Sequence, residues 1–427
     1  MARVKLVERK VLVPFVVVTS LFALWGFAND ITNPMVAAFS TVMEISNVRA
    51  SLIQFAFYGG YATMAIPAAL FVQRFNYKKG IVLGLAFYAV GTLLFFPAAH
   101  YQVFEFFLLA LYVMTFGLAF LETTANPYIL SLGAKETATR RLNLAQAFNP
   151  LGSLLGMFVA SRLVLASLQS DQRDPSGVLI FPGLDEAAKA AIRTNDLLVI
   201  RDPYLVLGLV VVVVLGVVLF TRMPDTTRSA KVDFWPSVKR LYNNKIYRYG
   251  VVAQVFYVGA QIMCWTFIIH YADHLGIDKA RAQLYNMVAM GAFLCSRFVG
   301  TLLMRYINAR QLLLVFALAA ASCIVGAVFL EGMAGLWSLV ATSAFMSLMF
   351  PTIYGIALED VGQDTTLGAA GLVMAIVGGA LMPPCQGAII DLGQIGSFPS
   401  VKASFVLPLI CFLVIARFAS YCRLTRS

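Results

Sequence analysis

Long hydrophobic segments alternate with short polar ones along the whole chain. A helix needs about 20 predominantly apolar residues to cross a bilayer, and twelve segments of the sequence meet this requirement. We expect them at 11–38, 50–73, 80–98, 104–131, 142–167, 203–221, 249–272, 282–304, 311–330, 335–358, 367–390 and 400–421. The pattern therefore predicts an all-α integral membrane protein with twelve transmembrane helices.

Composition agrees with this pattern. Hydrophobic residues make up 60% and charged residues 12% of the 427 residues, whereas soluble proteins have about 45–50% and about 25%. The apolar runs are also too long for a membrane β-barrel, whose strands need only about 9–11 alternating residues. Both a soluble protein and a membrane barrel are excluded, and the lipid bilayer is the expected surrounding.

Basic residues are distributed unevenly among the loops. The net charge of +11 comes mainly from the N-terminal segment, the central loop 222–248 and every second short loop. Because Lys and Arg accumulate on the cytoplasmic side of membrane proteins, we expect both termini in the cytoplasm. The charge reports membrane topology and predicts no nucleic-acid partner.

Two loops are longer than the others. Residues 168–202 contain both charge signs together with proline and glycine, which is typical of an aqueous loop on the outer side. Residues 222–248 contain seven basic residues and follow the sixth predicted span. We interpret this second loop as a cytoplasmic connection between two halves.

An internal repeat supports the division into halves. A shift of 231 positions places Gly60 on Gly291, and the first residue of one basic loop, Arg74, on Arg305. We therefore expect an N-terminal half at 1–222, a linker at 223–248 and a C-terminal half at 249–427. Two parallel six-helix repeats are typical of major facilitator transporters.

Glu122 is an acidic residue in the middle of the fourth predicted span, within Leu121-Glu122-Thr123-Thr124-Ala125-Asn126-Pro127. A charge at the centre of the bilayer costs at least about 2.5–3.5 kcal/mol. Burial in an apolar cavity favours the protonated, neutral form of a carboxyl group. We interpret Glu122 as a proton carrier, although a hydrogen bond to a neighbouring helix would also explain its presence.

Asp30 lies in the first predicted span, within Ala28-Asn29-Asp30-Ile31-Thr32-Asn33-Pro34. Asp30 and Asn33 are three residues apart and so share one face of a helix. Pro34 loosens the helix locally. The two polar residues fit the lining of a transport cavity, while a solvated cap at an early helix end is the alternative.

Amides and aromatic rings recur at helical spacing in two further spans. In the fifth span Asn143, Gln146 and Asn149 follow at i, i+3 and i+6, and amides both donate and accept hydrogen bonds, as sugar hydroxyls require. In the seventh span Tyr257, Gln261 and Trp265 follow at i, i+4 and i+8. Polar contacts between helices are the alternative for the amides, above all for Asn143.

Other chemistry is not supported by the sequence. The chain has no GxxxxGK[ST] loop, nucleophile elbow or HExxH helix, which argues against an enzyme or an ATP-driven pump. His270 and His274 have the spacing of metal ligands but no third ligand nearby. We therefore predict no metal site and no cofactor. Arg297 in the eighth span could pair with a carboxylate or with main-chain carbonyl groups.

Several motifs resemble the fucose:proton symporter family of the major facilitator superfamily. The matching segments include 24–29, 52–58, 121–127, 141–149, 257–265, 345–353, 362–365 and Gly378-Gly379. They cover all but the termini and the two long loops. The segment with Gln261 and Trp265 is more similar to the fucose branch than to the glucose/galactose branch.

This resemblance implies alternating access and proton-coupled uptake of a sugar. The family has one important acid in span one and one in span four. The second matches Glu122, but the position of the first is Asn33 here, and the family's asparagine three residues earlier is Asp30. We expect Asp30 to take over the carboxylate role from one turn away.

The sequence thus predicts a multi-pass transporter of a bacterial inner membrane, acting as a monomer. It would import L-fucose or a related hexose together with a proton, with Glu122 and Asp30 as coupling residues. A glucose/galactose-type uniporter or an exporter of the same fold is the alternative. The expected sugar-binding residues are Trp25, Asp30, Asn33, Glu122, Asn126, Gln146, Asn149, Tyr257, Gln261 and Trp265.

Overall fold

The computed structural model describes residues 6–32, 35–45, 49, 52–172, 174, 179–225, 233–277, 279–396 and 398–425. Its α-helices are α1 (Leu12–Thr32), α2 (Met35–Val42), α4 (Leu52–Arg74), α5 (Tyr77–Leu93), α6 (Phe95–Tyr101), α7 (Phe104–Ser131), α8 (Ala138–Gln146), α9 (Asn149–Val159), α10 (Glu186–Phe220), α11 (Phe234–Asn243), α12 (Lys245–His274), α13 (Lys279–Leu303), α14 (Ala309–Phe329), α15 (Gly332–Met346), α16 (Met349–Leu358), α17 (Thr365–Met374), α18 (Gly378–Ile390), α19 (Ser400–Ser404) and α20 (Val406–Leu424). Two short strands, β1 (Gln394–Ile395) and β2 (Phe398–Pro399), form an antiparallel hairpin.

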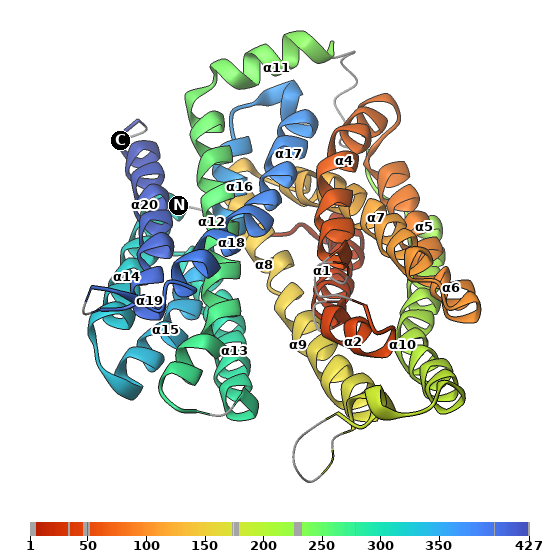
Figure 1. The fold of residues 1–427 in the computed structure, drawn as a ribbon. Helices are drawn as coiled ribbons and strands as arrows, with labels where there is room; N and C mark the ends of the chain where they lie inside the picture. The colour runs from red at the N-terminus through yellow and green to blue at the C-terminus, as the bar shows by residue number, and fades with distance from the viewer. Residues whose placement is uncertain are drawn as a thin grey trace.

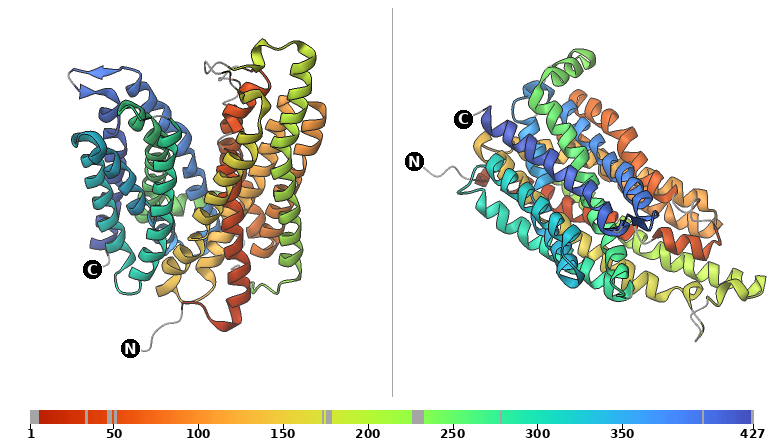
Figure 2. Two further views of the ribbon diagram at one scale, coloured as in Figure 1. Left: turned by 90° about the horizontal axis from the view of Figure 1, so that it is seen from below. Right: turned by 60° about the vertical axis from the view of Figure 1, so that its left-hand side comes forward.

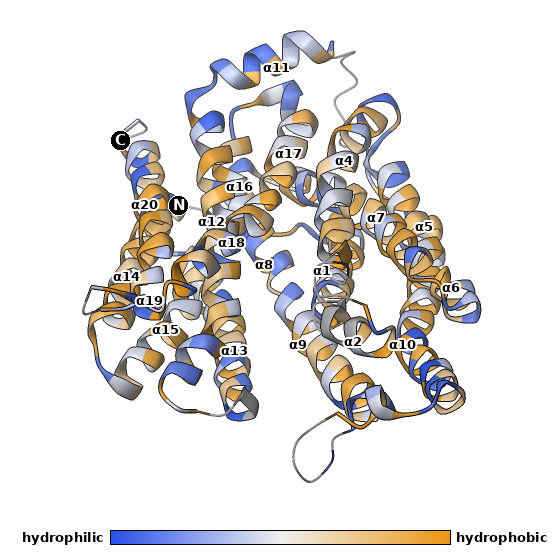
Figure 3. Cartoon of the chain, in the orientation of Figure 1, coloured by the Kyte–Doolittle hydropathy of each residue, from blue (hydrophilic) through white to orange (hydrophobic). Residues whose placement is uncertain are grey.

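The fold class predicted from the sequence is confirmed. Within the described residues, twelve helical segments are long and apolar enough to cross a membrane, one for each predicted span. Hydrophobic residues predominate along these helices, and hydrophilic residues collect at their ends, at the start of α10 and on α11 (Figure 3). The protein is therefore a multi-pass membrane protein.

Helix α10 is longer than the sequence pattern predicted. The predicted outer loop at 168–202 is wrong in its second part, because α10 begins at Glu186. The Asp185 carboxylate caps this helix by accepting a hydrogen bond of 2.7 Å from the Ala188 N–H. The alanine-rich segment that follows has a high helix propensity, which hydropathy alone does not register.

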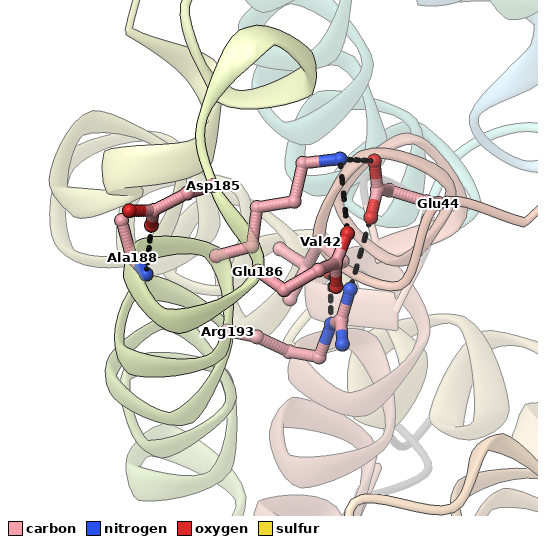
Figure 4. A network of polar contacts seen from close by, with 7 residues as sticks. Val42, Glu44, Asp185, Glu186, Ala188 and Arg193 are labelled. Atoms are coloured by element: carbon pink, nitrogen blue, oxygen red, sulfur yellow. Dashed lines mark hydrogen bonds and ion pairs between the residues drawn. The ribbon is translucent and has the colours of Figure 1, made fainter.

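A cluster of charges joins α10 to α2 (Figure 4). The Glu44 carboxylate accepts hydrogen bonds from Lys189 Nζ at 2.8 Å and from Arg193 Nη2 at 3.0 Å. Arg193 Nε also donates to the Val42 carbonyl at 3.2 Å. These contacts fix the far end of the first span to α10. We call this end of the molecule the α2 side.

Among the described residues, three spans are interrupted near their middle. The fifth is divided between α8 and α9, the tenth between α15 and α16, and the eleventh between α17 and α18. Pro150 follows the first interruption and Pro351 the second, and proline removes an N–H group from the helical hydrogen bonds. The interruptions expose main-chain carbonyl groups inside the protein.

Helices of the first and second parts of the chain form two groups (Figure 1). In one view of Figure 2 the groups lie close together at the end of the C-terminus and separate toward the opposite end. Helices α1 and α9, which belong to the first group, approach closely. A Cβ atom at Gly26 would lie 2.0 Å from the Asn149 carbonyl oxygen, so only glycine fits there.

The linker contains an ordered helix, α11, that lies across the bundle at the end we call the α11 side (Figure 1). Arg240 forms two hydrogen bonds with the Asp364 carboxylate, at 2.8 Å and 2.7 Å. These hydrogen bonds raise the pKa of the Arg240 guanidinium above its ordinary value. The ion pair holds α11 against the start of α17.

Candidate transport site

A cavity of about 140 Å³ lies between the two groups of helices. Both groups contribute side chains to it. Most of the residues that the sequence analysis selected line this cavity: Trp25, Asp30, Glu122, Gln146, Asn149, Tyr257, Gln261 and Trp265. The structure therefore brings together polar and aromatic residues from α1, α7, α8, α9 and α12.

Glu122 lies on α7 at the cavity and is 8% exposed. Four residues further along the same helix, Asn126 Nδ2 donates a hydrogen bond of 3.1 Å to the Glu122 main-chain carbonyl. Among the described residues, no ion pair includes Glu122. A buried carboxyl without a cationic partner is stabilised in its protonated form.

Asp30 lies two residues before the end of α1 and lines the same cavity, with 9% of its surface exposed. Helix α1 continues beyond it to Thr32, so Asp30 does not form a solvated cap. Asn33, the other predicted polar residue of this span, lies outside the described residues. The cavity thus contains two carboxyl groups that come from different helices.

The amides of the fifth span divide between two places. Gln146 and Asn149 line the cavity, and Gln146 Nε2 donates to Asn126 Oδ1 at 2.8 Å. Asn126 does not line the cavity itself but holds Gln146 in place. Asn143 instead donates to Thr352 Oγ1 at 3.2 Å and joins α8 to α16.

Hydrogen bonds orient the aromatic rings around the cavity. Trp25 Nε1 donates to the Tyr61 hydroxyl at 2.9 Å, and Trp265 Nε1 donates to Ser343 Oγ at 3.1 Å. The Tyr257 hydroxyl donates to the Met346 carbonyl at 3.1 Å. With these polar atoms occupied, the three aromatic side chains contribute apolar surface to the cavity.

Further lining residues were missed by the sequence analysis. They include Phe22, Tyr58, Tyr61, Ser153, Phe293 and Phe350. An aromatic residue in a hydrophobic span gives no signal of its own, because most such residues face lipid or the protein core. The polar hydroxyl groups of Tyr58, Tyr61 and Ser153 were the signals in the sequence that could have pointed to the site.

Arg297 of α13 lies at one end of the cavity and is 3% exposed. Its Nη1 atom donates to the Gln146 carbonyl at 2.9 Å, and its Nε atom donates to the Ser347 carbonyl at 2.5 Å. Both acceptors lie where a span is interrupted, so their carbonyl groups are available. A buried guanidinium is thereby satisfied by main-chain oxygen atoms.

The described residues contain no group of three or more His, Cys, Asp or Glu side chains suited to a metal ion. His270 and His274 lie on α12 and do not line the cavity. The groups that the cavity offers to a ligand are carboxyl groups, amides, hydroxyls and aromatic rings.

Comparison with known proteins gives the family. A model of the Major Facilitator Superfamily matches residues 17–383. The L-fucose-proton symporter of Haemophilus influenzae is 60% identical over 96% of this chain and 97% of its own length. A glucose/galactose transporter of Brucella abortus is 32% identical over 93% of this chain and 91% of its own length.

A crystal structure of the Escherichia coli fucose:proton symporter FucP is similar throughout, with a TM-score of 0.88 and 32% identity. The match covers 97% of this chain and 99% of that chain. A structure of FucP in the outward conformation matches equally well. Fold and cavity define a membrane transporter and not an enzyme. The chain belongs to the Major Facilitator Superfamily and, within it, to the fucose:proton symporter family.

Proposed function

We propose that this protein imports L-fucose, or a closely related hexose, together with a proton. The observation that carries the proposal is one cavity with two carboxyl groups, Glu122 and Asp30, among amides and aromatic rings. The carboxyl groups can carry a proton, and the amides and aromatic rings can bind a polyhydroxylated ring. The 60% identity to an L-fucose-proton symporter supports this substrate over glucose or galactose.

Glu122 is the proposed proton carrier. A buried charge is unfavourable unless it is paired, so the site changes conformation most readily when Glu122 is protonated. Binding of a proton from one side and its release on the other then drives the change in one direction. Asp30 would share this role or bind sugar hydroxyls.

A chain of hydrogen bonds links the proton carrier to the contact between the helix groups. Asn126 donates to the Glu122 carbonyl, Gln146 Nε2 donates to Asn126 Oδ1, and Arg297 donates to the Gln146 carbonyl. A movement of this turn of α7 on protonation would therefore be transmitted to Arg297 in the other group. This linkage is our proposed route for coupling.

We further propose that residues 1–222 and 249–427 are the two moving halves and that both termini are cytoplasmic. The α11 side, which contains the basic loops, is then the cytoplasmic side. The hydrogen bonds between the groups support an outward-facing state, since among the described residues they lie at the cavity or nearer α11. They are Tyr77–Thr366, Arg140–Thr301, Asn143–Thr352 and Arg297–Gln146.

The test is uptake by purified protein in liposomes, with a panel of labelled monosaccharides and a record of internal pH. We expect L-fucose accumulation to require an inward proton gradient and to acidify the interior. The Glu122→Gln variant should keep exchange of internal for external sugar and lose accumulation. Accumulation by Glu122→Gln would contradict the proton-carrier role.

The same experiment separates the alternatives. A uniporter would equilibrate the sugar without a change in internal pH and would be insensitive to the proton gradient. A glucose/galactose-type transporter would prefer those sugars to L-fucose in competition. Gln261→Ala is the control, because it removes one proposed sugar contact and no carboxyl group. It should weaken sugar binding, while the remaining uptake should still depend on the proton gradient.

A further inference from the structure

A second, larger cavity of about 650 Å³ lies between the helix groups on the α11 side. One group contributes Gln73, Lys135 and Arg140, and the other contributes Arg310 and Glu359. Its size is within the range of about 300–1,000 Å³ that is usual for small-molecule sites. None of its lining residues belongs to the transport cavity described above.

A wall of polar contacts separates the two cavities. Helix α8 passes from one cavity to the other: Gln146 lines the transport cavity, Asn143 bonds to Thr352, and Arg140 lines the second cavity. The second cavity is therefore a separate space in this conformation.

The second cavity is rich in hydrogen-bond donors. Among the described residues, the Arg140 guanidinium forms one hydrogen bond, from its Nε atom to the Thr301 carbonyl, so both of its terminal nitrogens are available. The Lys135 side chain has no ion pair or hydrogen bond within the part of the chain that the structure describes. Unused donors call for a ligand that offers mainly acceptors.

The charges favour the same class of ligand. Lys135, Arg140 and Arg310 line the cavity together with Glu136 and Glu359. Glu359 is paired with Arg310, so its negative charge is compensated within the protein. Helices both begin and end around this cavity, so the side chains and not the helix dipoles decide its charge. Three cationic and two acidic side chains leave the lining with a net positive charge. Among the described residues, Lys135 and Arg140 have no acidic partner, and Arg310 contacts Glu359 through its Nη2 atom, which leaves Nη1 for a ligand.

We propose that the second cavity binds a phosphate-bearing anion and that this ligand holds the two halves together on the α11 side. Phosphate oxygen atoms accept several hydrogen bonds at once and pair well with guanidinium and ammonium groups. A ligand that contacts Lys135 of one half and Arg310 of the other stabilises the conformation in which both line one space. With α11 in the cytoplasm, as proposed above, an intracellular phosphate compound would slow uptake.

Binding can be measured without any transport. Purified protein in lipid-free detergent is titrated with inorganic phosphate at constant ionic strength, with chloride as the reference anion, and thermal unfolding is followed. We expect phosphate to stabilise the protein more than chloride does. Lys135→Gln should weaken phosphate binding about tenfold, as the loss of one charge-assisted hydrogen bond would, and Lys135→Arg should restore it.

A matched control is Lys239→Gln, because Lys239 is an exposed lysine of α11 that lies outside the cavity. Its response to phosphate should equal that of the unmodified protein. An equal response in Lys135→Gln and Lys239→Gln, or none in any variant, would overturn the proposal. Stabilisation that requires phosphatidylglycerol and disappears in Lys135→Gln would assign the same site to a lipid headgroup.

The effect on the conformation is tested in liposomes. Phosphate enclosed in the vesicles should reduce the initial rate of sugar uptake at least twofold, and Lys135→Gln should be insensitive to it. Unchanged uptake despite phosphate binding would overturn the proposed link to the conformational change. If the unmodified protein took up no sugar even without phosphate, the proposed transport function would fail and not the phosphate site. The failure of one proposal can therefore be told from the failure of the other.

Discussion

Arg297 and Gln146 join the two groups of helices at the end of the transport cavity. Arg297 Nη1 donates a hydrogen bond of 2.9 Å to the Gln146 carbonyl, although 151 residues separate them in sequence. The acceptor is available because α8 ends at Gln146. When the halves move apart at this point, the guanidinium loses its partner and must be satisfied otherwise.

We expect Arg297→Lys to reduce sugar uptake at least tenfold. Lysine keeps the charge but cannot donate to the Gln146 and Ser347 carbonyls together in the geometry of a guanidinium. Each hydrogen bond from a charged group contributes about 1.5–3 kcal/mol. The measurement is the initial rate of proton-driven uptake in liposomes. Arg417→Lys, an exposed position on α20, is the control and should leave the rate unchanged.

The position of the acid in the first span can be tested by exchange. Asp30→Asn should abolish sugar accumulation, because the second carboxyl group of the cavity is lost. In Asp30→Asn/Asn33→Asp the carboxyl group returns three positions further along the chain, and we expect part of the accumulation to return. Uptake at given internal and external pH values is the measurement. Full accumulation in Asp30→Asn would show that Asp30 takes no part in coupling.

The contact between Asn143 and Thr352 should stabilise the closed wall between the two cavities. Thr352→Val keeps the shape of the side chain and removes the hydroxyl group that accepts the hydrogen bond. In a double-mutant cycle with Asn143→Ala we expect a coupling free energy of about 0.6 kcal/mol, the usual value for such contacts in membrane proteins. Unfolding in detergent measures it. Additive effects of the two substitutions would contradict a direct contact.

The charge cluster on the α2 side should contribute modestly to stability. Glu44 contacts two cations and its side chain is 35% exposed, so solvent screens the pairs. We expect Glu44→Gln to lower the free energy of unfolding by about 1 kcal/mol and the difference to shrink at high salt. Glu105 pairs with Arg49, and the Glu105 side chain is 60% exposed. Glu105→Gln should therefore lower the free energy of unfolding by less than Glu44→Gln does. A larger effect for Glu105→Gln would refute this ranking by exposure.

Much of the site could be predicted from the sequence because polar residues in a membrane span are conspicuous. Glu122, Asp30 and Gln261 stand within long apolar segments, and each lines the cavity. The same signal cannot tell a cavity from a contact between helices. Asn143 and Gln146 share a helical face, yet one bonds to Thr352 and the other lines the cavity. Their distance from the interruption of the fifth span decides this difference.

The sequence by itself determined the number of spans, the fold class and most of the polar residues of the cavity. Hydrophobic length and buried charge act locally along the chain, so a linear pattern records them. The tertiary structure alone decided the partners of Arg297 and the presence of a second cavity. These features depend on carbonyl groups and side chains that lie far apart in sequence, 50 and 151 residues for the two partners of Arg297, and only packing of the helices brings them together.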